Sequence, residues 1–198
     1  MAGVDDVTDR DVMRSSLGDP AAFEAIFDRY HARIFRYLAA RAGAAAAEDL
    51  ASEVFVVAFQ QRESFHPEAT SAGPWLYGIA ANMARRHHRA HARRRRAYGR
   101  APGPGVMWLD PDSASRVDAE RQVRLLTSEL KRLRTKDLEV LLLYALGDLT
   151  YTEIAEALDI PVGTVRSRLS RIRERFRNRI PLEGQEPGDR SEQTGGGE

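Results

Sequence analysis

The chain has 198 residues, an apolar content of 42%, a charged content of 30% and a formal net charge of +1. This length allows one or two small domains, and the composition is typical of a globular protein. A run of about 18 apolar residues is absent, which argues against membrane insertion, and the polar, acidic start is unlike a signal peptide. The chain has no cysteine, which excludes disulfides and thiol chemistry. We therefore expect a cytoplasmic protein.

The first part of the chain is predicted to be a helical domain, because its apolar residues recur at helical spacing. Pro20 in the first turn and Gly43 at the end bound the first helix. Turn-forming residues in segment 65–74 interrupt the pattern. In chain order we expect a loose lead-in over 1–17 and helices over about 20–41, 44–64 and 74–96.

The stretch 99–115 is rich in proline and glycine and predicts a flexible linker between two domains. Helical stripes resume beyond it, and the acidic segment 181–198 has the composition of a disordered tail. No segment shows the alternation of a strand. The predicted fold is all-α, with two helical domains over 18–98 and 116–180 joined by this linker.

The nearly neutral net charge conceals two basic blocks. Residues 84–100 carry many arginines and no acidic residue, and residues 166–179 carry arginines opposed only by Glu174. Two such blocks far apart in a nearly neutral chain indicate two contacts with one polyanion.

The sequence YTEIAEALDIPVGTVRSRL, residues 151–169, has the form of a helix-turn-helix. Such a unit places its second helix in the major groove of DNA. We expect Asp159 at the tight turn to tolerate a left-handed backbone. Arg166 and Arg171 can read guanine edges, and the outer arginines can hold phosphates. The alternative is a plain helical hairpin with a solvated basic face. The candidate DNA-binding residues are Thr164, Arg166, Ser167, Arg168, Ser170 and Arg171.

Enzymatic chemistry finds little support in the sequence. No nucleophile with a base, metal cluster or phosphate-binding loop stands out. His87, His88 and His91 lie among arginines without a nearby carboxylate or cysteine, so we expect a basic surface there and no metal site. The prediction is a protein that is not an enzyme and has no cofactor.

At this point the chain, from about Gly18 to Arg179, resembles a bacterial RNA polymerase sigma factor of the extracytoplasmic-function (ECF) group. Four stretches carry the resemblance in order: GDPAAFEAIFDRYHARIFRYL, AEDLASEVFVVAF, PWLYGIAANMARRHHR and LTYTEIAEALDIPVGTVRSRLSR. Each is moderately specific alone, and the four in this order are highly specific.

The resemblance implies a role for each domain. The first would dock on core RNA polymerase and melt the −10 element, and the second would read the −35 element. Loop 65–74 would capture an unstacked base, with Trp75 either a stacking platform or, as we favour, part of the core. The implied −10 DNA-binding residues are Asn82, Arg85, Arg86 and Arg89, and the implied polymerase-binding residues are Asp49, Ser52 and Glu53.

Two readings remain open beside this one. On their own, Asp49 and Glu53 would more simply keep their helix soluble. A free-standing helix-turn-helix regulator would use only the last two helices and leave the first domain unexplained. Membership of the ECF group is compatible with an inhibitory anti-sigma partner, but the sequence does not identify such a protein. The partners we expect are core RNA polymerase and promoter DNA.

Overall fold

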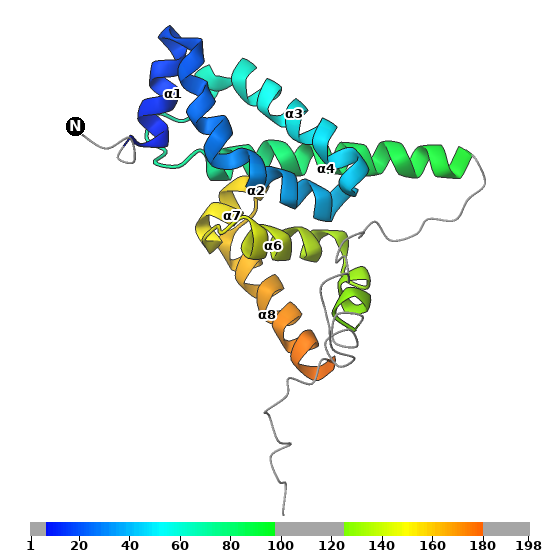
Figure 1. Ribbon diagram of the computed structural model, residues 1–198. Coiled ribbons are helices and arrows are strands. Elements are labelled where there is room, and N and C mark those ends of the chain that lie inside the picture. Colours follow the sequence, from blue (N-terminus) through cyan, green and yellow to red (C-terminus); the bar gives the residue numbers. More distant parts are fainter. Residues whose placement is uncertain (1–6, 98–124, 180–198) are drawn as a thin grey trace, which may run out of the picture.

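The computed structural model describes residues 7–97 and 125–179, and within these ranges every regular element is a helix (Figure 1). The all-α prediction is therefore confirmed for the described chain. The predicted linker over 99–115 and tail over 181–198 lie outside the described residues.

The first domain packs three long helices against one another around a core of aliphatic and aromatic side chains. Ile26, Ile34, Leu38, Val54 and Leu76 are almost fully buried in it. Each long helix presents one apolar stripe, so the three stripes can meet in one core. The elements are α1 (Asp9–Gly18), η2 (Pro20–Phe23), α2 (Glu24–Ala42), α3 (Ala44–Gln60), η3 (Arg62–Ser64) and α4 (Gly73–Ala97).

The helix α1 corrects the prediction of a loose lead-in over residues 1–17 for the part from Asp9 onward, while residues 1–6 lie outside the described residues. The Thr8 side chain caps it by accepting a hydrogen bond from the Asp11 amide. Val12 and Met13 are buried, and so are the polar Asp9 and Ser16. The segment looked like a lead-in because half of its buried face is polar, which weakens the apolar periodicity.

Local signals fix the ends of α2. Asp19 accepts a hydrogen bond from the Ala21 amide at 3.1 Å, which starts the short turn η2 at Pro20. At the other end Gly43 has φ 92°, a backbone conformation that favours glycine. This tight connection sends α3 back along α2, and the two helices pack closely.

The second domain contains residues 125–131, which are helical, and three further helices. These are α6 (Thr135–Leu146), α7 (Tyr151–Leu158) and α8 (Val162–Arg179). Their core is formed by Leu143, Ile154, Val165 and Leu169, all of which are buried.

The two domains are packed against each other along a surface that we call the seam, where α7 lies across α4 and α6 lies against α2 (Figure 1). Arg33 of α2 donates to the Gly147 carbonyl at 2.7 Å, and Arg85 of α4 pairs with Glu139 of α6 at 3.0 Å. A methyl group built on Gly78 would lie 3.1 Å from the Ala157 carbonyl oxygen. The absence of a side chain at Gly78 therefore allows α7 to approach α4.

The seam also buries polar groups that the described residues leave without hydrogen bonds. The rings of Tyr37 and Tyr77 meet edge to face at 5.6 Å, and their hydroxyls are buried without a partner in the described chain, as are Nε and Nη2 of Arg41. Burial raises the pKa of both tyrosines. The seam therefore contains buried polar groups as well as apolar contacts, which is typical of an interface between domains.

No helix in the described ranges is long and apolar enough to cross a membrane.

The seam generates a prediction for Gly78→Ala. Alanine favours a helix interior over glycine by about 1 kcal/mol, so α4 itself should not weaken. The added methyl group should nevertheless push α7 away from α4. Because the chain has no cysteine, spin labels on Glu63→Cys and Glu174→Cys report the distance between domains. We expect a longer or broader distance distribution in Gly78→Ala.

The matched control is Gly18→Ala, because a methyl group there meets no atom within 4 Å. It should leave the distance distribution unchanged. An identical distribution in Gly78→Ala and the parent protein would contradict the close packing of α7 on α4.

Candidate nucleic-acid interface

The helix-turn-helix consists of α7, a tight turn and α8. Thr150 caps α7 through a reciprocal capping box with Glu153. Asp159 has φ 51° and ψ 54°, which is the left-handed conformation expected from the sequence. The Ile160 amide then donates to the Ala155 carbonyl at 3.0 Å, and α8 begins directly after Pro161.

The helix α8 has two distinct faces. Val165, Leu169 and Ile172 are buried against the rest of the domain. On the other side Arg166, Ser167, Ser170 and Arg171 are exposed, and Thr164 is half-buried. Arg171 Nε donates to the Ser167 carbonyl at 3.2 Å, so its side chain lies along the exposed face.

Arg168 differs from the other α8 residues predicted to bind DNA. Its side chain is only 16% exposed, and its Nε lies 3.8 Å from the Asp137 carboxylate. Its Nη1 donates to the Lys136 carbonyl at 3.3 Å. Arg168 therefore fastens α8 to the first turn of α6.

The outer arginines of α8 also have partners within the domain. Arg175 and Arg179 lie 3.0 and 3.3 Å from the buried Glu129 carboxylate. Arg173 donates to the Tyr151 hydroxyl at 2.6 Å. Some of the arginines that we predicted to hold phosphates are therefore engaged by partners within the domain. Their pairing depends on residues 22 to 50 positions away, which helical periodicity cannot show.

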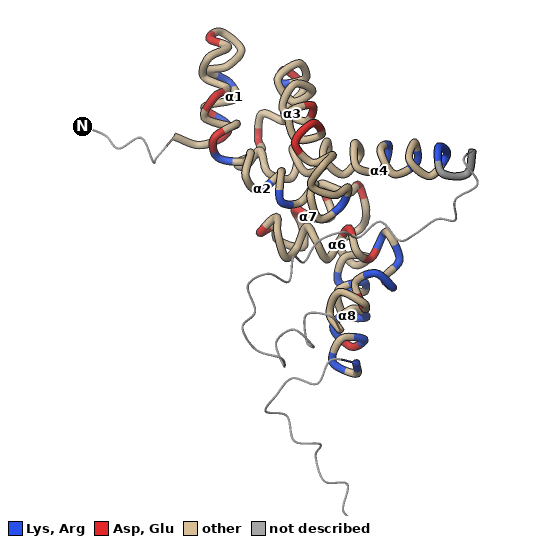
Figure 2. Tube along the Cα trace, turned by 45° about the vertical axis from the view of Figure 1, so that its right-hand side comes forward, with Lys and Arg blue, Asp and Glu red and all other residues tan. Residues whose placement is uncertain are grey.

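The helix α4 carries the second basic surface, on the half that projects beyond the core (Figure 2). Asn82, Arg86 and Arg89 are exposed. Arg85 is drawn into the seam, where its guanidinium donates to both Glu139 and Asn82. Of the four residues predicted to bind −10 DNA, three are therefore exposed, and Arg85 is held in an ion pair at the seam.

The three histidines His87, His88 and His91 lie on the basic half of α4. No group of three or more metal-ligating side chains gathers anywhere in the described ranges. The rings of His87 and His91 stack at 6.2 Å. Burial, followed by the charge of Arg41, lowers the pKa of His88 and favours its neutral form.

The loop predicted over 65–74 ends before Gly73, where α4 begins. Residues 65–72 are named the capture loop, after the role that the resemblance implies for this loop. Its ends are buried at Phe65 and Ala72, and its exposed residues are His66, Pro67, Glu68 and Thr70. Trp75 is half-buried with its ring edge-on to Phe65 at 5.6 Å. This contact supports core packing for Trp75.

The helix α3 presents an acidic and apolar stripe. The predicted residues Asp49, Ser52 and Glu53 are all exposed on it, and the stripe continues through Val56, which is 54% exposed, to Gln60. The sequence reading missed Val56, although an apolar residue among the polar positions of an amphipathic helix is a recognisable signal of a contact surface.

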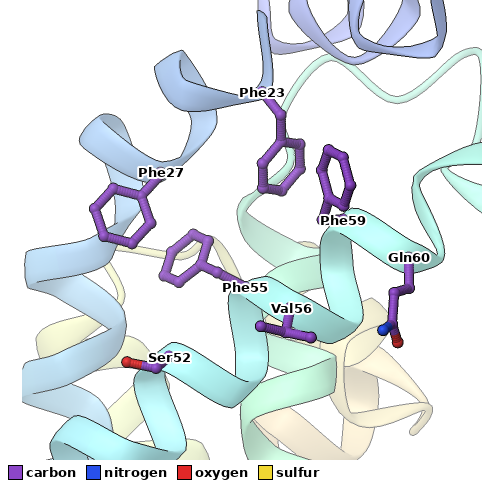
Figure 3. Close-up of a pocket in the computed structure, with 7 residues that line it drawn as sticks. All are labelled: Phe23, Phe27, Ser52, Phe55, Val56, Phe59 and Gln60. Carbon is purple, nitrogen blue, oxygen red and sulfur yellow. The ribbon is translucent and has the colours of Figure 1, made fainter. Parts of the chain in front are cut away.

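An open aromatic groove of about 480 Å³ runs beside the α3 stripe (Figure 3). Phe27 and Phe55 pack edge to face across it at 4.9 Å, and Phe23 and Phe59 do the same at 5.4 Å. Phe27 remains 38% exposed. The groove and the stripe together suit a partner with an apolar face and basic side chains.

Comparison with known families and proteins covers both domains. Residues 26–94 match Sigma-70 region 2, and residues 124–176 match Sigma-70, region 4. The ECF RNA polymerase sigma-E factor of Haemophilus influenzae is 32% identical over 182 residues, which cover 85% of this chain and 93% of that protein. The factor of the same name from Escherichia coli K12 is 29% identical, with coverage of 85% and 92%.

Two solved structures are similar in fold. One is the sigma factor RpoE of Bartonella quintana in complex with the anti-sigma factor NepR, with a TM-score of 0.66 and 19% identity. The match covers 81% of this chain and 98% of that one. The other is CnrH in complex with the cytosolic domain of CnrY, with a TM-score of 0.63, 21% identity and coverage of 86% and 95%.

The helix-turn-helix with its exposed arginines lies in the region 4 match, and the basic α4 lies in the region 2 match. The similarity to the sigma-E factor extends over nearly the whole length of that relative. The chain therefore belongs to the ECF RNA polymerase sigma factors, non-enzymatic proteins that direct RNA polymerase to promoters.

Proposed function

We propose that this sigma factor binds its partners through three surfaces. The helix α8 binds the −35 element, α4 and the capture loop bind the −10 element, and α3 binds core polymerase. The observation that carries the proposal is the two-faced α8. Its exposed face holds Arg166, Ser167, Ser170 and Arg171 opposite a buried apolar face. A free face with hydrogen-bonding groups on a second helix suits the major groove.

In this proposal, the part of α8 nearest the turn reads the −35 element. Arg166 and Arg171 carry planar guanidinium groups that can form two hydrogen bonds with guanine. Ser167 and Ser170 lie between them and can reach base edges or phosphates. Arg168, held by Asp137, contributes by orienting α8.

The −10 element is contacted by Asn82, Arg86 and Arg89 of α4 and by the exposed capture loop. Arginines along a helix can follow a phosphate backbone while the strand is opened. Arg85 joins them only when its pair with Glu139 is broken. We propose that the seam parts when the factor engages polymerase and the promoter.

Binding to core polymerase falls to the α3 stripe and the aromatic groove. The carboxylates of Asp49 and Glu53 can pair with basic side chains, while Val56 and Phe27 offer apolar surface.

We also propose an anti-sigma partner and a cytoplasmic location. One of the two solved structures described above is a complex of a sigma factor with a protein named an anti-sigma factor, which supports the proposed partner.

Run-off transcription tests the proposal. Core bacterial polymerase would be assayed with and without this protein on a pool of genomic promoter fragments, with mapping of the transcript starts. We expect new discrete starts that depend on the factor. Arg166→Ala combined with Arg171→Ala should reduce them by roughly 30-fold or more, since each of the two bidentate base contacts contributes about 1–3 kcal/mol.

The matched control is Arg166→Lys with Arg171→Lys. Lysine keeps the charge but lacks the planar fork, so it should retain salt-sensitive DNA binding while losing discrimination at the −35 element. Polymerase without new starts, together with tight binding of duplex DNA by the protein alone, would contradict the proposal and favour a free-standing regulator.

Charge reversal on α3 tests the polymerase surface. Asp49→Lys with Glu53→Lys should lower affinity for core polymerase by about tenfold or more, because like charges would meet at the contact. Fluorescence anisotropy of the labelled factor titrated with core polymerase measures this affinity. Glu63→Lys changes the charge in η3, outside the stripe, and should have little effect. Equal affinities for all three proteins would remove α3 from the interface.

A further inference from the structure

We propose that α1 holds the capture loop in the conformation that reads the −10 element, with Asp9 as the central positioning residue. This inference rests on the proposed function, in which the capture loop takes a base from the opened strand. It assigns a role to α1, the helix that the sequence reading took for a lead-in. In the fold, α1 lies beside α2 and close to the capture loop (Figure 1).

Asp9 fastens the second arm of the loop. Its carboxylate accepts a hydrogen bond from the Ala72 amide at 2.8 Å and from the Tyr30 hydroxyl on the same oxygen. The other oxygen accepts from Arg29 at 2.7 Å. The Tyr30 hydroxyl also lies 3.1 Å from Ser71 Oγ. A single buried carboxylate thus joins α1 and α2 to the last two residues of the capture loop.

Arg10, the next residue of α1, fastens the first arm. Its Nη2 donates to the Glu68 carbonyl at 2.6 Å, and its Nε lies 3.5 Å from the Ala69 carbonyl. The loop also folds on itself at this point, because the Ala69 amide donates to the His66 carbonyl at 3.0 Å. Adjacent residues of one helix therefore hold both arms of the loop.

The placement of these contacts distinguishes positioning from simple packing. Val12 and Met13 already bury the apolar side of α1 in the core. The polar side chains of Asp9 and Arg10 add contacts to the loop, while His66 and Thr70 stay exposed at its outer edge. Holding a loop in its bound shape removes the cost of ordering it during binding. A base can then be recognised by exposed groups held in a fixed position.

The Asp9 network is buried enough for its hydrogen bonds to matter. Asp9 is 7% exposed and Tyr30 is 8% exposed. Burial, together with the hydrogen bond to Asp9, raises the pKa of Tyr30 to about 12. Tyr30 therefore keeps its proton near neutral pH and donates it to Asp9, which leaves a lone pair of the hydroxyl oxygen available to Ser71.

The test is the base preference of the holoenzyme. Core polymerase would be reconstituted with each full-length variant and assayed in single-round transcription on promoters that carry each base at each −10 position. The ratio between preferred and disfavoured bases does not depend on the fraction of active protein. A residue with a purely structural role would change yield and leave this ratio unchanged.

Tyr30→Phe and Ser71→Ala remove the two hydroxyls of one link and keep the packing. Each should lower the preference at the captured base by roughly three- to tenfold, the effect of about one buried hydrogen bond. Each hydroxyl also has a partner of its own, Asp9 for Tyr30 and the Gly73 amide for Ser71. Because the two variants share the bond between the hydroxyls, the double variant should lose less than the product of the two single effects. Asp9→Asn should act in the same direction, and preference at the −35 element should not change.

Asp11→Asn is the matched control, because Asp11 is an exposed aspartate on the same helix that contacts only the Thr8 cap among the described residues. It should leave the preference unchanged. If Tyr30→Phe and Ser71→Ala lower yield without changing the preference, the positioning role of α1 is wrong.

Loop variants separate this inference from the proposed function. His66→Ala and Thr70→Ala alter exposed groups of the capture loop itself. If they change the −10 preference while the network variants do not, only the role of α1 is overturned. If neither loop variant changes it, the capture loop is not the reader, and the −10 assignment fails together with the inference.

Discussion

The packing of α7 across α4 is the contact on which the arrangement of this protein depends. Gly78 permits it by leaving room for the Ala157 carbonyl. Beside it, the Arg85–Glu139 pair joins α4 to α6 across the same seam. The seam therefore influences which charges face solvent: Arg86 and Arg89 remain exposed while Arg85 is paired. Because the seam buries the unpaired hydroxyls of Tyr37 and Tyr77 in the described chain, it has the polar character of an interface between domains that can separate.

Charge in this molecule therefore has two roles that composition cannot distinguish. Some arginines of α8 complete the fold, as Arg168 does with Asp137 and Arg175 does with Glu129. Others, such as Arg166, face solvent on the helix that would enter the groove. A similar division holds for carboxylates, since the buried Asp9 accepts hydrogen bonds from Arg29, Tyr30 and the Ala72 amide, while Asp49 faces solvent.

Most of the fold could be predicted from sequence, and most of the candidate site residues are exposed as a contact surface requires. The helical stripes and the turn at Asp159 depend on residues close in sequence, and the structure agrees with them. Contacts between residues far apart could not be predicted in this way. The pairing of Arg85 with Glu139 joins positions 54 residues apart. The helix α1 was missed for the related reason that Asp9 finds its partners in α2 and the capture loop, so its burial leaves no local apolar pattern.

The most direct test of this description is the distance between the domains in the free protein and in the complex with core polymerase and promoter DNA. Spin labels on Glu63→Cys and Glu174→Cys suit the measurement, because the natural chain has no cysteine. We predict a short, narrow distribution in the free protein and a longer one in the complex, as the seam parts and Arg85 is released. The same short distance in both states would contradict the opening of the seam and would exclude a direct role for Arg85 at the −10 element.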